Sequence, residues 1–181
     1  MMRIETVAVL GTGEAAHACA MLAALSGCAV RVHDPALALL DAAFEAVRFR
    51  VELAIERGLL TRTDRQRILD GILFTPDLDE AVTGADLIAE LDGEVAEGAH
   101  RLAGAADRVR ATAALAAADA GAALALAGAV AQPGRVLVLV VDRSGGFSRL
   151  SVDAGPSTSP HTLAGTRDFA SRLNARGRHE G

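Results

Sequence analysis

An apolar run that ends in a glycine turn is the feature that most constrains the fold of this chain. Residues 6–10 (Thr-Val-Ala-Val-Leu) are typical of a strand buried on both faces of a parallel sheet. The turn at residues 11–16 follows at once, and a helix-prone stretch runs from His17 to Leu25. A second strand at residues 28–33 ends on Asp34. This order of strand, turn, helix, strand and acidic residue indicates a βαβ unit.

The glycine turn has the residues of a dinucleotide-binding site. Backbone N–H groups and the dipole of the following helix favour an anion such as pyrophosphate at this position. Gly11 permits the tight turn, Gly13 lets the backbone approach the phosphates, and Ala16 takes the helix-packing position. Asp34 can accept hydrogen bonds from the adenosine ribose and would repel a 2′-phosphate, which favours NAD over NADP. The predicted cofactor-binding set is Gly11, Thr12, Gly13, Glu14, Ala15, Ala16 and Asp34. The alternative is a helix-packing turn that has lost its ligand.

The rest of the chain alternates between helical and strand patterns. A long amphipathic helix is expected from Ala36 to Arg57, and a second helix, capped near Thr61 to Asp64, continues to about Asp70. Strands are expected at 72–74, 86–89, 109–112, 136–141 and 148–152, and helices at 77–82, 95–106, 119–130 and 162–174. A turn is expected at 142–146. We predict one α/β domain over residues 1–175, a doubly wound parallel sheet of Rossmann type with a helical pair inserted after the second strand. Residues 176–181 are expected to form a frayed tail.

Charge and composition exclude several classes of partner. The net charge of −5 and an aromatic content of 3% argue against nucleic acid, which needs basic surfaces and stacking platforms. The sequence contains no 18-residue apolar span, so no membrane partner is expected. Cys19 and Cys28 are too few for a disulfide framework and lack metal-ligand spacing, so neither a metal site nor an oxidising compartment is expected. These features predict a cytoplasmic protein.

Further segments carry a family resemblance. They are Glu-Arg-Gly-Leu-Leu-Thr at 56–61, Phe-Thr-Pro-Asp-Leu-Asp-Glu-Ala-Val at 74–82, Ala-Asp-Leu-Ile-Ala-Glu at 85–90 and Gly-Pro-Ser-Thr-Ser-Pro-His-Thr-Leu at 155–163. With the glycine turn, they make the chain similar to the N-terminal NAD-binding domain of the 3-hydroxyacyl-CoA dehydrogenase family, from Ile4 to about Ala175. The helical pair after the second strand is a feature of that family.

The resemblance implies an oxidoreductase of fatty-acid metabolism that converts an L-3-hydroxyacyl-CoA to the 3-ketoacyl-CoA. In the family, a His held by a Glu acts as general base, and hydride passes to NAD. Aligning the chain on Pro133 and Arg135 places Val140 at the His and Val152 at the Glu, and neither valine can move a proton. The resemblance adds Glu94 to the predicted cofactor contacts. No catalytic residue is therefore predicted.

The resemblance also gives two candidate contacts for coenzyme A. Arg50 and Arg57 on the long helix correspond to positions that contact the CoA moiety in the family. They lie seven residues apart and so share a helix face, and two guanidiniums could pair with CoA phosphates. The alternative is a solvated charged face in which Glu52 and Glu56 are the partners.

Other titratable groups are weaker candidates for the missing base. Asp142 and Asp153 flank the two valines, and either carboxylate could act as a base if it were desolvated. His17, His33 and His100 are interpreted as local polar residues rather than catalysts.

Two functions follow from these observations. The first is a hydroxyacyl-CoA oxidoreductase whose own catalysis is lost or depends on a partner chain, because the family's helical C-terminal domain is expected to be absent here. The second is a non-catalytic nucleotide-binding or assembly module derived from such an enzyme. Loss of the covering domain would expose a sheet edge and apolar surface, so we expect a homodimer that forms through that surface.

Overall fold

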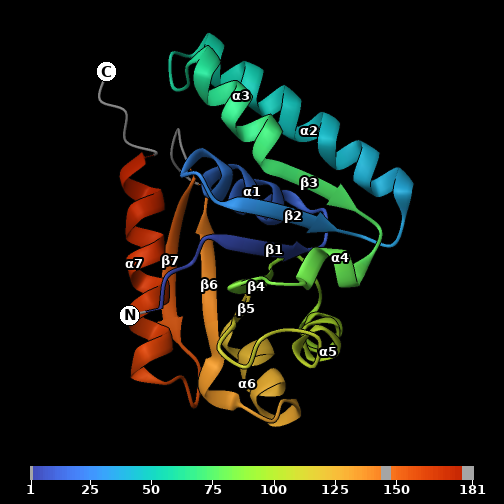
Figure 1. Cartoon of the computed structure of the whole chain (residues 1–181), viewed down its shortest axis with the longest axis vertical. Coiled ribbons are helices and arrows are strands. Elements are labelled where there is room, and N and C mark those ends of the chain that lie inside the picture. Colours follow the sequence, from blue (N-terminus) through green and yellow to red (C-terminus); the bar gives the residue numbers. More distant parts are fainter. Residues whose placement is uncertain (1, 144–147, 177–181) are drawn as a thin grey trace.

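A computed structural model describes residues 2–143 and 148–176 (Figure 1). Its sheet has seven strands in the order β3-β2-β1-β4-β5-β6-β7. The first six strands are parallel, and β7 is antiparallel to β6. The strands are β1 (Thr6–Leu10), β2 (Ala29–His33), β3 (Ile72–Thr75), β4 (Leu87–Glu90), β5 (Ala114–Ala117), β6 (Val136–Asp142) and β7 (Arg149–Ala154). The order 3-2-1-4-5-6 is that of a Rossmann sheet, so the predicted fold is confirmed.

Helices cover both faces of the sheet, and each face has its own apolar core. One core joins the sheet to α1, α2, α3 and α7, and the other joins it to α4, α5 and α6. The helices are α1 (Glu14–Leu25), α2 (Leu37–Glu56), α3 (Arg62–Gly71), α4 (Leu78–Val82), α5 (Val95–Ala106), α6 (Ala120–Ala129) and α7 (Pro160–Arg176), with a 3-10 turn η1 (Pro133–Arg135) before β6. No helix in the described part of the chain is long and apolar enough to span a membrane.

The predicted helical pair is present as α2 and α3. The hydroxyl of Thr61 accepts a hydrogen bond from the Asp64 N–H at 3.1 Å, and the Asp64 carboxylate accepts one from the Thr61 N–H at 2.9 Å. This capping box starts α3 where the sequence predicted. Phe44 of α2 meets Phe74 of β3 edge-on, with ring centroids 5.8 Å apart, and so fixes the pair against the sheet.

One predicted strand was wrong. The sequence suggested residues 109–112, where Val109 and Thr112 supply β-branched side chains, but the strand is β5 at residues 114–117. All four residues of β5 (Ala-Leu-Ala-Ala) are buried, because helices cover both faces of the sheet at this point. Three of these four residues are alanine, which is depleted in strands, so no β-branched signal marks this strand in the sequence. The last helix reaches Arg176; residues 177–181 of the predicted tail and 144–146 of the predicted turn lie outside the described residues.

Candidate functional site

The carboxyl ends of β1, β2 and β4 bring the predicted cofactor residues together. The chain leaves β1 through Gly11, whose φ of +99° is strained for any residue with a side chain. The Gly11 N–H donates to the carbonyl of His33 at 2.9 Å, which joins the turn to the end of β2 beside Asp34. On the other side β1 pairs with β4, and Leu10 lies opposite Glu90. The strand order reverses between β1 and β4, and the crevice at such a point is where ligands bind in open α/β sheets.

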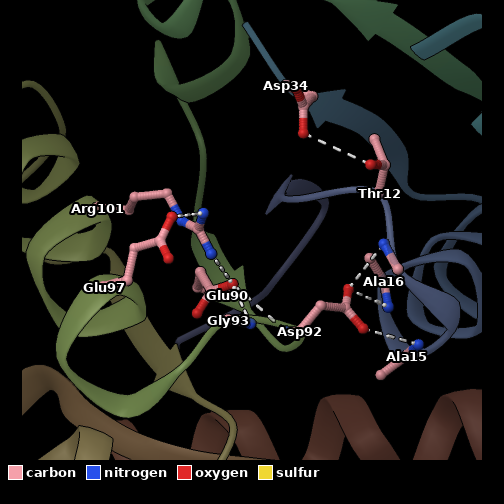
Figure 2. A network of polar contacts seen from close by, with 10 residues as sticks. Thr12, Ala15, Ala16, Asp34, Glu90, Asp92, Gly93, Glu97 and Arg101 are labelled. Atoms are coloured by element: carbon pink, nitrogen blue, oxygen red, sulfur yellow. Dashed lines mark hydrogen bonds and ion pairs between the residues drawn. The ribbon is translucent and has the colours of Figure 1, made fainter. Parts of the chain in front are cut away.

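Asp34 lies just after the carboxyl end of β2, where the sequence predicted it, and its side chain points toward Thr12 of the glycine turn (Figure 2). Its Oδ1 accepts a hydrogen bond from the Ala36 N–H at 2.9 Å, which orients the carboxylate at the start of α2. Among the described residues, only the Thr12 hydroxyl reaches its Oδ2, at 3.5 Å. Because that contact is long, Oδ2 keeps capacity to accept hydrogen bonds from a ribose.

A residue that the sequence did not single out lies at the N-terminus of α1. The Asp92 carboxylate accepts hydrogen bonds from the backbone N–H groups of Gly13 at 3.2 Å, Ala15 at 3.1 Å and Ala16 at 3.0 Å (Figure 2). These are the donors that the glycine turn offers to an anion. The one available signal was position, since Asp92 follows β4 at the edge of the sheet where β1 also ends.

The buried carboxylate of Glu90 holds the backbone of the loop that carries Asp92. Glu90 is 2% exposed, and its Oε1 accepts hydrogen bonds from the Gly93 N–H at 3.0 Å and from Arg101 at 2.8 Å. Arg101 also pairs with Glu97 at 2.9 Å, one turn earlier on α5. Glu94, the predicted family contact, is exposed and is the N-cap residue of α5. The backbone around Asp92 is therefore anchored to α5.

The two arginines predicted to contact CoA line one cavity of about 510 Å³ between α1 and α2. Arg50 pairs with Glu14 at 2.9 Å, and Arg143, at the end of β6, pairs with the same carboxylate. Glu14 thus faces this cavity rather than the crevice. In the described part of the chain, neither arginine pairs with Glu52 or Glu56, the partners expected on the same helix. Glu52 pairs instead with Arg65 of α3 at 2.6 Å.

The positions aligned with the family's general base and with the residue that holds it lie on neighbouring strands. Val140 of β6 is 39% exposed, while Val152 of β7 is 7% exposed and lies opposite Leu139. Asp142 and Asp153 are both exposed, so neither carboxylate is desolvated. Asp142 lies opposite Arg149, four residues from Asp153 along β7, or about 13 Å at strand spacing. The two aspartates therefore do not form a pair.

The three histidines lie in different surroundings. His33 contacts the carbonyl of Thr75 through Nδ1 at 3.1 Å, and His100 is exposed on α5. His17 of α1 is 6% exposed, and neither of its ring nitrogens has a hydrogen-bond partner among the described residues. Burial first, and then the nearby Arg50, lower the pKa of His17, so its ring is neutral at pH 7.

The residues at the glycine turn fit the pyrophosphate and ribose of a dinucleotide. Three convergent N–H groups, a glycine without a side chain at position 13 and a carboxylate at the end of β2 are the required parts. In this structure the same N–H groups donate hydrogen bonds to the Asp92 carboxylate. Within residues 2–143 and 148–176, no three His, Cys, Asp or Glu side chains are grouped so that they could hold a metal ion.

Comparison with known proteins gives one consistent family. Residues 6–177 match the family model described as the NAD-binding domain of 3-hydroxyacyl-CoA dehydrogenase. A 3-hydroxybutyryl-CoA dehydrogenase of Mycobacterium tuberculosis is 32% identical over 109 residues, covering 52% of this chain and 38% of the relative. A 3-hydroxyadipyl-CoA dehydrogenase of Escherichia coli K12 is 31% identical over 94 residues, covering 52% of this chain and 20% of the relative.

Solved structures agree with this match. The crystal structure of FadB2 from M. tuberculosis superposes with a TM-score of 0.87 at 27% identity, covering 96% of this chain and 62% of that one. A diketoreductase superposes with a TM-score of 0.81 at 25% identity, with the same two coverages. The chain thus spans less than two thirds of the length of each of these relatives.

Proposed function

This chain belongs to the 3-hydroxyacyl-CoA dehydrogenase family through its NAD-binding domain, and from that premise we propose that it binds NAD(H) without completing the dehydrogenase reaction by itself. NAD is the cofactor of the matched domain. The observation that carries the proposal is the convergence of the N–H groups of Gly13, Ala15 and Ala16 beside Asp34.

Each part of the crevice has a defined role in binding. The three N–H groups and the dipole of α1 would hold the pyrophosphate, while Asp34 would accept hydrogen bonds from the adenosine ribose. Thr12 orients Asp34, and Gly11 makes the turn that directs the N–H groups outward. Glu94, exposed after β4, is proposed as a contact to the cofactor further along the same edge. When bound, NAD supplies the hydride acceptor.

Among the described residues, no candidate general base lies at the positions where the family carries its base and the partner of that base. Val140 and Val152 stand at the aligned positions of the family's base and its partner, and the carboxylates of Asp142 and Asp153 are exposed to water. General base catalysis contributes about a hundredfold to ten-thousandfold, so its loss leaves little turnover. Catalysis is therefore proposed to be lost or to depend on a partner chain; the alternative is a non-catalytic nucleotide-binding or assembly module.

An acyl-CoA is the substrate class we propose for a partner-assisted reaction. Two of the relatives named above, the 3-hydroxybutyryl-CoA dehydrogenase and the 3-hydroxyadipyl-CoA dehydrogenase, act on CoA thioesters by name. In this chain Arg50 and Arg57 line one cavity, and their guanidiniums are suited to CoA phosphates. Arg50 must exchange Glu14 for such a phosphate, whereas no partner for Arg57 is recorded among the described side chains.

We also propose that two copies of the chain associate. Four of the eight large apolar side chains that are exposed in the described part of the chain lie on α2, which supports contact between two copies there. They are Leu37, Leu39, Phe44 and Phe49.

The two cysteines support a reducing compartment. Cys19 and Cys28 are free and buried, which suits the cytoplasm.

Equilibrium binding and turnover test the proposal together. NADH fluorescence should change on binding to the wild-type protein. Asp34→Asn should weaken binding about tenfold, because a hydrogen bond to the ribose is weakened. The same variant should prefer NAD over NADP less strongly, because it loses the charge that repels a 2′-phosphate. Mixing NAD with 3-hydroxybutyryl-CoA should produce no NADH above background. Absence of any fluorescence change contradicts cofactor binding, and steady NADH production contradicts the loss of catalysis.

A further inference from the structure

The N-terminus of α1 already holds an anion, and that anion comes from the chain itself. Oδ2 of Asp92 accepts hydrogen bonds from the N–H groups of Gly13 and Ala16, and Oδ1 accepts one from Ala15. Hydrogen bonds to a charged acceptor are stronger than neutral ones, and the positive end of the helix dipole strengthens them further. Asp92 therefore occupies the donors on which cofactor binding depends.

The carboxylate also fills the space that the cofactor needs. A Cβ built at Gly13 would lie 2.4 Å from both Cγ and Oδ1 of Asp92. The room created by the absence of a side chain at Gly13 is thus taken up by the Asp92 carboxyl group. A phosphate and this carboxylate cannot share it, because they overlap in space and carry charge of the same sign.

The surroundings of Asp92 allow its side chain to leave without a rearrangement of the loop. Glu90 accepts hydrogen bonds from the backbone N–H groups of Asp92 at 3.4 Å and Gly93 at 3.0 Å, and Arg101 holds Glu90 in turn (Figure 2). This network fixes the backbone on either side of the carboxylate. Asp92 itself is exposed, so rotation of its side chain would place the carboxylate in water.

We propose that Asp92 is an internal competitor of the cofactor. In the closed form its carboxylate caps α1 and excludes the pyrophosphate, and NAD binds the open form in which the side chain has rotated into solvent. The measured dissociation constant is then the intrinsic one divided by the open fraction. This inference rests on the proposed function, since Asp92 would regulate the same NAD site.

Calorimetric titration of NAD into four proteins tests the competition. Asp92→Ala removes the competitor and should lower the dissociation constant about tenfold or more relative to wild type. Asp92→Asn keeps the size but loses the charge, so it should give an intermediate constant. Asp70→Ala removes an exposed carboxylate near the C-terminal end of α3, just before β3 begins, and should bind NAD as the wild type does. Circular dichroism checks that each variant is folded.

A ligand-free measurement gives a second readout. In ¹⁵N-labelled protein, Asp92→Ala should shift the amide signals of Gly13, Ala15 and Ala16 relative to wild type, and Asp70→Ala should leave them in place. Unchanged signals in Asp92→Ala overturn the closed form.

The possible failures are distinct. Equal NAD affinity of wild type and Asp92→Ala overturns the competition alone and leaves NAD binding intact. No binding by any of the four proteins overturns the proposed function and the competition with it. Binding by Asp92→Ala with none detected for wild type supports the competition, and it contradicts NAD binding by the wild-type protein at the concentrations tested.

Discussion

At the scale of single residues, His17 is the side chain least matched to its surroundings. It is buried in α1, and neither ring nitrogen has a hydrogen-bond partner among the described residues. Burial, and to a smaller extent the positive charge of Arg50, lower its pKa below 6.5. The negative charges of Asp92 and Glu14 oppose this shift with smaller effects. Because folding lowers this pKa, the unfolded chain takes up a proton near pH 6.5 that the folded chain does not. The stability tied to neutral His17 is therefore full above pH 6.5 and is lost below it, down to the folded pKa.

His17→Leu should remove this dependence. It replaces two unsatisfied buried polar atoms with apolar ones, so the free energy of unfolding at pH 7 should rise by about 1 kcal/mol. Between pH 7 and pH 5.5, the free energy of unfolding measured by urea denaturation should fall less for the variant than for wild type. His100→Gln, at an exposed position, is the matched control and should keep the wild-type fall. An equal fall in His17→Leu would show that another group is responsible.

Cys19 gives a second residue-scale prediction. Complete burial raises the pKa of its thiol to about 12, so the thiolate that alkylating reagents attack is nearly absent at pH 8. Iodoacetamide should leave Cys19 unmodified in native protein and modify it after denaturation, as read by mass spectrometry. Rapid labelling of native Cys19 would contradict the buried packing of α1.

At the scale of elements, the edge strand β7 is protected by side chains of α7. Asn174 accepts a hydrogen bond from the Leu150 N–H and donates one to the Leu150 carbonyl, both at 2.8 Å, which reproduces the pairing of a further strand. Arg167 donates to the carbonyl of Val152 at 3.4 Å. These contacts close the edge that the sequence led us to expect as exposed, so α2 is the better surface for self-association.

Asn174→Ala should therefore weaken the fold and open the edge. Loss of two hydrogen bonds to the partly buried strand should lower the free energy of unfolding by about 1 to 2 kcal/mol and increase aggregation on mild heating. Ser171→Ala, exposed one turn earlier on α7, is the control. Chemical denaturation and light scattering measure the two effects, and wild-type behaviour of Asn174→Ala would contradict the protective role.

At the scale of the whole molecule, local patterns predicted most of the fold and, within the candidate site, singled out the glycine turn and Asp34. The glycine turn and Asp34 were recognised because their spacing is set within one βαβ unit. Asp92 was not, because its role depends on the pairing of β1 with β4, about 80 residues apart in sequence, and on one side-chain rotamer. The position of β5 was missed because its alanines carry no strand propensity of their own.

Self-association is the other property decided at this scale. Light scattering with size-exclusion chromatography should give the mass of two chains, and Phe49→Glu, which places a charge on the exposed side of α2, should shift the protein toward a monomer. A wild-type monomer at working concentration would refute the homodimer.

A crystal structure of the protein soaked with NAD tests the central claim most directly. The account predicts pyrophosphate on the N–H groups of Gly13, Ala15 and Ala16, the adenosine ribose on Asp34, and the Asp92 carboxylate turned away from α1. A turn that still holds Asp92 at saturating NAD, with no nucleotide density beside Asp34, would contradict the assignment of this domain as NAD-binding.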